Sequence, residues 1–445
     1  MRISIVGTGY VGLVSGACLA DCGHDVTCVD LDAAKVAMIN AAQPTIHERG
    51  LPELLARNVG TRLRATTDVV KAVRDSEVTF IAVGTPAADG RIDLSYVLEA
   101  ARGIGVALRD KPDYHVVVVK STVVPGTTDG PVREQLEKAS GLRAGNEFGL
   151  GMNPEFLTEG QAVDDFSAPD RIVIGGIDPR TREVLARIYA GFAGITRIET
   201  NNTTAEFIKY ASNAVLATMI SFSNEIARLC AAVGDVDVVD VMRGVHESCY
   251  FTSRPAGQPP VKAGIISFLE AGCGFGGSCL PKDVTALVAH GREHGLGMPL
   301  LASVLEVNRG QPDETMRMIG RHYSDLAGVR VAVLGLAFKP DTDDVRESPA
   351  FPLIRQLVAK GAVVTAYDPV ARPEGNEALA GVLLAESLGE ALADAKVVVV
   401  VTRWNEFREL RGALDALGLE PLVVDGRRVL EPGAFRAYEG IGRSG

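Results

Sequence analysis

The chain has 445 residues, of which 47% are hydrophobic and 23% charged, a composition typical of a globular protein with two or three domains. Its formal net charge of −11 gives a nucleic-acid partner no electrostatic support, and no apolar run approaches the roughly 20 residues that span a bilayer. The seven cysteines form no CxxC pairs, which argues against disulfides or zinc and favours a reducing cytoplasm. The first residues, MRISIVGTGY, predict a strand and a turn without the layout of a signal peptide.

The first predicted elements form a βαβ unit with a glycine-rich turn. Residues 2–6 are predicted as a strand, GTGYVG follows, and a helix and a second strand, DVTCVD, come next. In this context Gly7 makes the turn, Gly9 lets a pyrophosphate approach the backbone, and Gly12 allows close helix–strand packing. The unit predicts a dinucleotide site, and the alternative is a glycine turn that binds nothing.

An acid and a base follow this unit. Asp30 ends the second predicted strand, where a carboxylate bonds the ribose 2′-hydroxyl and repels a 2′-phosphate. NAD is therefore favoured over NADP, unless Asp30 is only a helix cap. Lys35 is placed to reach the adenosine end of the cofactor.

Polar residues lie at the ends of the later predicted strands. EVTFIAVGTP ends near Thr85, HVVVVKST ends at Ser121 and Thr122, and LGMNPEFLTEG delivers Glu155 and Glu159 after a turn. Ligands of open α/β sheets lie outside the carboxyl ends of strands, so the hydroxyls point at the nicotinamide half of the cofactor. Helix capping is the alternative for each of Thr85, Ser121 and Thr122. The two acids suit general acid–base work, or are ordinary surface charges.

A long helix is predicted next. TTAE at residues 203–206 has the pattern of a capping box, and the helical pattern stops at Gly234, so roughly 30 residues make a rod of about 45 Å. Residues 207–222 are apolar nearly all round, which predicts burial. Lys209 and Asn213 interrupt this surface one turn apart, and we interpret them as site residues rather than solvated side chains. Lys209 would stabilise a developing oxyanion. The rod is also a natural dimer spine.

An irregular stretch at residues 248–272, with Arg254 and Lys262 as its basic residues, leads to GFGGSCLPKD. Glycines let this loop lie close against a ligand, and the following proline favours a first helical turn, so Cys279 is predicted at a helix N-terminus. The partial positive charge there stabilises a thiolate nucleophile, and Asp283 projects from the first turn on the same side. The alternative is a small buried cysteine beside an acid that only complements the helix dipole.

The last part of the chain repeats the pattern of the first. VRVAVLG matches MRISIVG, AVVTAYDP matches DVTCVDLD, and KVVVVVTRW matches EVTFIAVGTP. A second Rossmann-like sheet is predicted, and because its glycine finger is absent it should not bind a dinucleotide. Lys339, Arg346 and Arg427 are basic groups near strand ends and suit a diphosphate. Alternatively, they only pair with the acids at 341, 343 and 344.

The motifs GTGYVGLVSGACLA, VGTP, KSTVVPGTT, NPEFLTEG, PDRIVIGG, KYASNA, GFGGSCLPKD and LAFKPDTDDVRESP, in this order, resemble the UDP-glucose/GDP-mannose (nucleotide-sugar) 6-dehydrogenase family, whose best-known member is UDP-glucose 6-dehydrogenase. The resemblance covers nearly the whole chain. It implies an α/β fold of two Rossmann-like, doubly wound domains joined by a long helix, usually as a homodimer. Together with the charge, apolar runs and cysteines described above, this predicts a cytoplasmic protein without membrane or nucleic-acid partners. The expected domains are residues 1–200 for NAD, 201–312 for the helical centre with the cysteine loop, and 313–445 for the UDP-sugar.

The resemblance also implies the reaction and its residues. UDP-glucose would be oxidised to UDP-glucuronate with two NAD+ in succession, through a thiohemiacetal and a thioester on Cys279. The implied catalytic residues are Cys279, Lys209, Asn213, Asp283, Glu155 and Thr122. The implied cofactor contacts are Gly7, Gly9, Tyr10, Val11, Gly12, Asp30, Lys35, Thr85, Ser121, Thr122, Glu159 and Arg346. The implied substrate contacts are Glu155, Phe156, Leu157, Glu159, Lys209, Asn213, Gly272, Phe275, Gly276, Phe338, Lys339 and Arg427. No metal is implied.

One departure and several alternatives remain. Family members usually show a short Arg-Ile-Gly or Arg-Pro-Gly step before the glycine loop, whose arginine reaches the partner subunit's substrate. Here a longer proline-rich loop replaces it, and Arg254 or Lys262 is a candidate substitute. The segment at residues 169–175 favours the UDP-glucose branch. GDP-mannose or a UDP-amino sugar as substrate, a dehydrogenase that stops at the aldehyde, and a non-catalytic protein that binds NAD and a nucleotide sugar are the alternatives.

Overall fold

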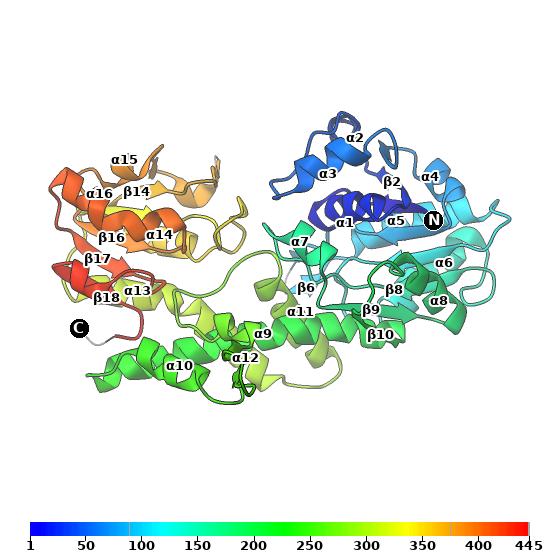
Figure 1. Cartoon of the computed structure of the whole chain (residues 1–445). Helices are drawn as coiled ribbons and strands as arrows, with labels where there is room; N and C mark the ends of the chain where they lie inside the picture. The colour runs from blue at the N-terminus through cyan, green and yellow to red at the C-terminus, as the bar shows by residue number, and fades with distance from the viewer. Residues whose placement is uncertain (89, 374, 444–445) are drawn as a thin grey trace. The chain divides into compact units, whose positions relative to one another are not determined.

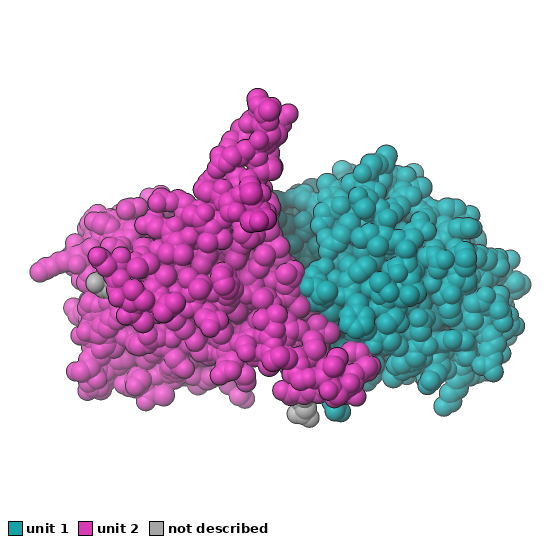
Figure 2. Space-filling view, turned by 90° about the horizontal axis from the view of Figure 1, so that it is seen from below, with its two compact units in different colours: residues 1–212 teal, residues 213–445 magenta. Residues whose placement is uncertain are grey.

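The computed structural model describes residues 1–88, 90–373 and 375–443 (Figure 1). They form two compact units, unit 1 (Met1–Ser212) and unit 2 (Asn213–Gly445), which Figure 2 colours separately. Each unit is built on a Rossmann-like sheet with helices on its faces, so the predicted α/β class with two such sheets is confirmed.

Within the described residues of unit 1, an eight-stranded sheet has the order β10-β9-β8-β7-β4-β1-β2-β3. The strands pair in parallel except at β8–β9, where the direction reverses. The predicted strand at residues 2–6 is confirmed to the residue. The strands are β1 (Arg2–Val6), β2 (Asp25–Val29), β3 (Leu63–Thr66), β4 (Val78–Ile81), β7 (Val116–Val119), β8 (Gly149–Met152), β9 (Arg171–Gly176) and β10 (Thr196–Thr200), beside a small hairpin of β5 (Ala87–Ala88) and β6 (Arg91–Ile92).

Helices cover both faces of this sheet. Successive residues of a strand point to opposite faces, and in central strands such as β7 the residues on both faces are apolar. Val116 and Val118 of β7 pack into one core, and Val117 and Val119 pack into the other. Helices α1 (Tyr10–Asp21), α2 (Ala33–Asn40), α3 (Leu51–Asn58), α7 (Ala162–Ser167) and α8 (Pro179–Ile188) contribute to the first core. Helices α4 (Val69–Asp75), α5 (Ser95–Leu108) and α6 (Arg133–Ser140), with the turn η1 (Thr128–Val132), contribute to the second.

Within the described residues of unit 2, a six-stranded parallel sheet has the order β15-β14-β13-β16-β17-β18. The predicted echo of the N-terminal βαβ unit is confirmed, since β14, β13 and β16 pair as β2, β1 and β4 do. The strands are β13 (Arg330–Leu334), β14 (Val363–Tyr367), β15 (Leu383–Leu384), β16 (Val397–Val400), β17 (Leu422–Asp425) and β18 (Ala437–Gly440).

The remaining helices of unit 2 are α10 (Val238–His246), α11 (Leu280–Glu293), α12 (Pro299–Arg309), α13 (Gln311–Gly320), α14 (Ala350–Ala359), α15 (Leu388–Leu392) and α16 (Leu410–Leu417). Short 3-10 turns are η2 (Gly264–Phe268), η3 (Glu377–Leu379), η4 (Asn405–Glu409) and η5 (Pro432–Ala434). The stretch at residues 248–272, expected to be irregular, contains a short hairpin of β11 (Thr252–Ser253) and β12 (Val261–Lys262).

Helix α9 (Asn202–Val233) runs from unit 1 into unit 2, and two predictions about it were wrong. Asn201, not a capping box, caps its N-terminus by accepting a hydrogen bond from the Thr204 N–H at 2.8 Å. The stretch at residues 207–222 is not buried all round, since Phe207, Val215 and Phe222 are 46%, 44% and 47% exposed. An apolar sequence does not distinguish a core face from an apolar face that stays uncovered in the single chain.

No helix in the described ranges combines the length and apolarity that crossing a membrane requires. Likewise, no cluster of three or more His, Cys, Asp or Glu side chains among the described residues has the arrangement to hold a metal ion.

Candidate active site

The glycine-rich turn of unit 1 has a shape that only glycine permits. Gly7 has a φ of +99°, and a Cβ there would lie 2.7 Å from the Ala82 carbonyl oxygen. A Cβ at Gly12 would overlap the Gly7 carbonyl oxygen, whereas a Cβ at Gly9 would meet no atom within 4 Å. The turn therefore packs tightly inward and stays open outward at the N-terminus of α1, where a pyrophosphate would bind. These residues fit a dinucleotide.

Asp30, directly after β2, is held by the same turn. It accepts hydrogen bonds from the Thr8 N–H (3.0 Å) and the Thr8 hydroxyl (2.5 Å), and from the Asp32 N–H (3.0 Å). Burial raises the pKa of Asp30, but the hydrogen bonds from Thr8 and Asp32 and the charge of Lys35 outweigh it, so the pKa lies below its usual value. The carboxylate stays ionised near neutral pH, and Asp32, not Asp30, caps α2.

The residues at the ends of β4 and β7 differ in their roles. Ser121 is buried and its hydroxyl donates to the Val83 carbonyl at 2.7 Å, so it joins the two strand ends and does not cap a helix. Thr85 and Thr122 are half-buried. Tyr10 accepts a hydrogen bond from the Gly160 N–H at 2.7 Å, which connects the glycine-rich turn to the loop that follows β8. Val11 beside it is half-buried.

Glu155, in that loop after β8, forms a buried ion pair with Lys209 of α9. The two side chains are 6% and 5% exposed, and Lys209 Nζ lies 2.9 Å from Glu155 Oε1. Glu155 Oε2 accepts from the Leu157 N–H at 2.7 Å. Burial has the largest single effect and raises the pKa of Glu155, but the charge and hydrogen bond of Lys209, the Leu157 N–H and the charge of Lys120 together lower the pKa below its usual value, so the carboxyl is held ionised. Phe156, Leu157 and Glu159 of the loop are half-buried.

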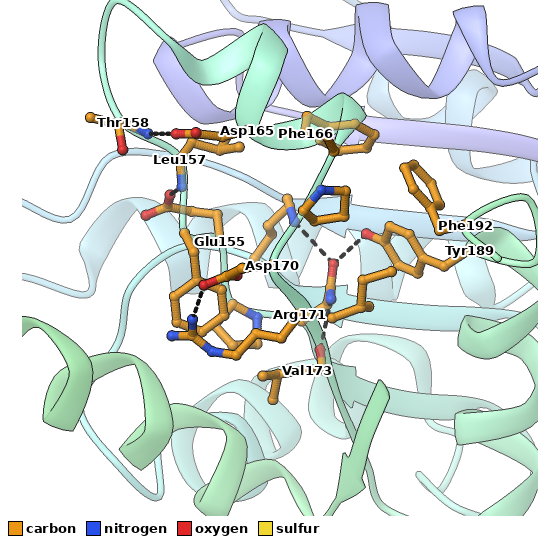
Figure 3. Close-up of a pocket in the computed structure, with 17 residues that line it drawn as sticks. Glu155, Leu157, Thr158, Asp165, Phe166, Asp170, Arg171, Val173, Tyr189 and Phe192 are labelled. Carbon is orange, nitrogen blue, oxygen red and sulfur yellow. Dashed lines mark hydrogen bonds and ion pairs between the residues drawn. The ribbon is translucent and has the colours of Figure 1, made fainter. Parts of the chain in front are cut away.

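A pocket of about 300 Å³ opens beside Glu155 (Figure 3). Its wall combines charged and aromatic side chains, including Lys120, Glu155, Asp165, Asp170, Arg171, Phe166, Tyr189 and Phe192. Asn153 Oδ1 accepts hydrogen bonds from Lys120 Nζ at 3.0 Å and from the Tyr189 hydroxyl at 2.6 Å. Lys120 was not predicted from the sequence, although a lysine after four buried valines carries the same signal that singled out Lys209.

Unit 2 places Cys279 at the N-terminus of α11, as predicted. It is the residue preceding the helix, and its carbonyl accepts from the Asp283 N–H at 2.8 Å. The Asp283 side chain is 1% exposed, and its two oxygens accept from Asn213 Nδ2 and Lys282 Nζ, each at 2.6 Å. Cys279 is only partly buried, and its Sγ lies 3.5 Å from the Ser278 hydroxyl oxygen. A partly exposed thiol therefore lies one helical turn from a buried, hydrogen-bonded acid.

The glycine loop before Cys279 is clamped from several sides. Gly274 and Gly277 have φ values of +100° and +83°, and a Cβ at Gly277 would lie 2.7 Å from the Phe338 ring. A Cβ at Gly276 would overlap the Glu347 carbonyl oxygen. The loop has no room for side chains, so the position of its backbone, and with it that of Cys279, is fixed by its neighbours.

Two asparagines that no sequence signal distinguished hold this loop. Asn308 of α12 accepts from the Phe275 N–H at 2.8 Å and donates to the Phe275 carbonyl at 3.0 Å. Asn224 of α9, which is fully buried, accepts from the Gly272 N–H at 2.8 Å. Their partners are backbone groups of distant residues, which is why the sequence alone does not reveal them.

Three family models match the chain, all of the UDP-glucose/GDP-mannose dehydrogenase family: the NAD binding domain at residues 1–193, the central domain at 203–310 and the UDP binding domain at 332–432. This chain belongs to that family. The expectation drawn from its motifs is confirmed, and with it an NAD-binding domain and dehydrogenase activity.

Relatives of this dehydrogenase span its full length. UDP-glucose 6-dehydrogenase AglM of Haloferax volcanii is 45% identical over 99% of the chain and 100% of the relative. GDP-mannose 6-dehydrogenase of Azotobacter vinelandii is 40% identical over 95% and 97%. A solved UDP-glucose dehydrogenase from Pyrobaculum islandicum has a TM-score of 0.88 at 38% identity, covering 99% and 98% of the two chains. A UDP-D-ManNAc dehydrogenase from Pyrococcus horikoshii has 0.84 at 27%, covering 100% and 99%.

The three basic residues predicted in the UDP-binding domain of this dehydrogenase have different partners in the structure. Arg427 donates to the Val401 carbonyl at 2.6 Å and to the Gly274 carbonyl at 2.9 Å, so it braces the glycine loop. Arg346 forms a bidentate pair with Asp344 at 2.7–3.0 Å, which is the pairing considered as the alternative to ligand binding. Lys339 is half-buried, with Nζ 5.9 Å from the centre of the Phe338 ring.

The two candidate substitutes for the missing arginine, Arg254 and Lys262, both form an ion pair with Glu247, which directly precedes their loop. Arg254 lies 2.6 Å from Glu247, and Lys262 lies 3.1 Å from the same carboxylate. All three side chains are exposed, and exposed pairs of this kind stabilise weakly, so the pairing does not hold either cation permanently.

Asn308→Ala is expected to lower kcat by about 10-fold or more and to reduce stability. The change leaves the Phe275 N–H and carbonyl without their partners, at a cost of roughly 1–3 kcal/mol, and loosens the loop that carries Cys279. Steady-state kinetics and thermal melting measure both effects. Ser303→Ala, at an exposed position of the same helix, is the matched control. An unchanged kcat in Asn308→Ala would show that the clamp does not matter for the reaction.

Glu206→Gln is expected to change how stability depends on pH. Glu206 of α9 is buried and accepts from the Gly126 N–H, the Thr128 N–H and the Thr128 hydroxyl at 2.6–2.8 Å. Burial raises its pKa from 4.5 to about 7 despite these bonds, so the folded protein favours the protonated form. Its contribution to stability is therefore present below about pH 4.5 and is lost as the pH rises through about 7, by about 3 kcal/mol.

The glutamine variant carries no such titration. Relative to the unaltered protein, it should gain a few degrees in apparent melting temperature as the pH rises from 5 to 8. Parallel melting curves of the two proteins across this pH range would contradict the raised pKa of Glu206.

Proposed function

We propose that this dehydrogenase oxidises UDP-glucose to UDP-glucuronate, with two NAD+ per sugar and a covalent intermediate on Cys279. The observation that carries the proposal is a partly exposed cysteine at the N-terminus of α11, in a glycine loop without room for side chains and one turn from the buried Asp283. The full-length similarity to UDP-glucose 6-dehydrogenases supports the choice of sugar.

The chemistry needs a nucleophile because two oxidations occur at one carbon. NAD+, when bound at the glycine-rich turn of unit 1, accepts a hydride from the sugar carbon in each oxidation. After the first, Cys279 Sγ attacks the aldehyde carbon, and the carbonyl oxygen takes up a proton to give a thiohemiacetal. The second oxidation removes that proton and leaves a thioester. Water then adds to the thioester carbon, the C–S bond breaks, and the sulfur leaves as a thiolate beside a carboxylate product.

The polar side chains have assigned roles in this proposal. Lys209 and Asn213 lie one turn apart on α9 and stabilise the oxygen that becomes negative during the reaction. Glu155, held ionised by Lys209, accepts a proton from the attacking water. Thr122 helps to hold that water. Asp283, fixed by Asn213 and Lys282, relays protons near the sulfur.

The remaining contacts are proposed from the motifs. The cofactor residues are Gly7, Gly9, Tyr10, Val11, Gly12, Asp30, Lys35, Thr85, Ser121, Thr122, Glu159 and Arg346. Ser121 would act as a hydrogen-bond acceptor, because its hydroxyl already donates to the Val83 carbonyl. The substrate residues are Glu155, Phe156, Leu157, Glu159, Lys209, Asn213, Gly272, Phe275, Gly276, Phe338, Lys339 and Arg427. The domains are proposed at residues 1–200, 201–312 and 313–445.

We also propose a cytoplasmic homodimer that contacts no membrane or nucleic acid. Its support is the exposed apolar row on α9, with Val215, Phe222, Leu229 and Val233 each more than 40% exposed. These residues recur at helical spacing and form one stripe, which a second copy of the chain would cover.

The substrate is tested by a panel of nucleotide sugars with the yield of NADH measured for each. UDP-glucose should give the highest kcat/KM and two NADH per sugar. GDP-mannose and UDP-amino sugars are the alternatives because relatives with those names share the fold and much of the sequence. A clear preference for either would replace UDP-glucose, and one NADH per sugar would overturn the four-electron reaction.

A further inference from the structure

Lys120 is a buried cation to which the proposed mechanism gives no role. It follows β7 directly and is 4% exposed. Within the described part of the chain, its ammonium makes one side-chain hydrogen bond, to Asn153 Oδ1 at 3.0 Å. An ammonium has three N–H donors, and leaving a charge buried with so few partners is costly. Its position therefore needs a compensating charge and further acceptors.

The pocket beside Glu155 supplies both. Lys120 and Glu155 line the same cavity of about 300 Å³, which has room for several waters. Asn153 and Tyr189 on its wall offer further polar atoms, and these are bonded to each other at 2.6 Å. A water in this cavity would find polar partners of the kind that ordered buried waters require, including the remaining donors of Lys120.

The charges around Glu155 come from several elements. Lys209 of α9 lies 2.9 Å away, and Lys120 after β7 also favours the ionised carboxylate. The other charged groups on the pocket wall have partners of their own: Asp165 of α7 accepts from the Thr158 N–H at 2.7 Å, and Asp170 pairs with Arg171 at 2.6 Å. In turn, Glu155 favours the charged form of Lys120, although burial lowers the Lys120 pKa to about 8. The two lysines and Glu155 therefore act as one coupled group.

We propose that Lys120 is a positioning residue that keeps Glu155 ionised and holds ordered water beside it in the pocket. The inference rests on the proposed function in one respect, that Glu155 must be ionised to accept a proton from the attacking water. The electrostatic coupling itself is a property of the folded protein without substrate. It can therefore be tested apart from catalysis.

The test is an infrared titration of Glu155 in Lys120→Met. The carboxyl band of Glu155 is assigned as the one absent from Glu155→Gln. Removing the charge of Lys120 should raise the titration midpoint of Glu155 by about one pH unit. Tyr189→Phe, which removes a neutral hydroxyl from the same hydrogen-bonded group, should leave the midpoint unchanged. An equal midpoint in Lys120→Met and the unaltered protein would overturn the proposal, whether or not the protein turns over UDP-glucose.

The pH profile of kcat provides the second readout. In Lys120→Met the midpoint on the acidic side of the kcat–pH profile (the acid limb) should shift to higher pH by the same amount. A merely structural role of Lys120 would lower the melting temperature and leave this midpoint unchanged. If Lys120→Met does not fold, Lys120→Arg replaces it. That variant keeps the charge at all pH values, so its acid limb should match that of the unaltered protein. In the unaltered protein, loss of the Lys120 charge near pH 8 should change kcat, and this alkaline change should be absent from Lys120→Arg. A Lys120→Arg profile that still shows the change near pH 8 would contradict the proposal.

Discussion

Cys279→Ser is expected to lower the steady-state rate of UDP-glucuronate formation from UDP-glucose by on the order of 1,000-fold or more. A serine hydroxyl at the same helix N-terminus remains protonated at neutral pH, because the dipole that helps a thiol to ionise is far too weak to ionise an alcohol. Without a nucleophile at this position the thioester cannot form, so the second oxidation is lost. Initial rates and the total NADH formed per sugar both measure the effect.

Cys249→Ser is the matched control for this change. Cys249 also belongs to unit 2 but is exposed and has no assigned role. Its variant should keep the full rate and two NADH per sugar. A Cys279→Ser protein that still gave two NADH per sugar at a comparable rate would exclude the covalent route.

Lys209→Met is expected to cost both stability and activity. The change leaves Glu155 buried without the cation 2.9 Å away, and breaking a buried ion pair by removing one partner costs about 3–5 kcal/mol. The Glu155 pKa should also rise, because burial then acts against a weaker opposing charge. We expect kcat to fall by roughly 100-fold or more, since the proposed mechanism also loses the cation assigned to stabilise the oxyanion. Thermal melting and kinetics measure the two effects.

The double variant Lys209→Met/Glu155→Gln separates these contributions. Glutamine removes the uncompensated charge, so most of the lost stability should return while the activity stays low. Lys138→Met, at an exposed position on α6, should change neither quantity. Full activity in Lys209→Met would show that the ion pair is structural only.

The sequence predicted best those features that depend on neighbouring residues. The strand at residues 2–6, the glycine-rich turn after it, and Cys279 at the start of a helix all follow from local spacing, and the structure has them in place. The repeat of the first βαβ unit in unit 2 was also visible, because the strands of both sheets are apolar runs that end in turn residues.

Features that depend on distant partners were missed or wrong. Glu206 had the spacing of a capping box, but its carboxylate binds the turn at Gly126 and Thr128 instead, and Asn201 caps the helix. Asn308 reaches a backbone 33 residues away, which no local pattern encodes. Arg427 was expected at a diphosphate, and the sequence did not reveal that two of its donors also reach the Val401 and Gly274 carbonyls. In each case the alternative partner is brought close only by the tertiary fold.

The central claim, that one sulfur atom holds the sugar between two oxidations, is tested most directly by mass spectrometry of protein quenched during turnover with UDP-glucose and NAD+. The account predicts an adduct on the peptide that contains Cys279, heavier by the nucleotide sugar less four hydrogen atoms, and absent from Cys279→Ser. Steady turnover to UDP-glucuronate with no adduct on that peptide, or with the adduct on another residue, would contradict it.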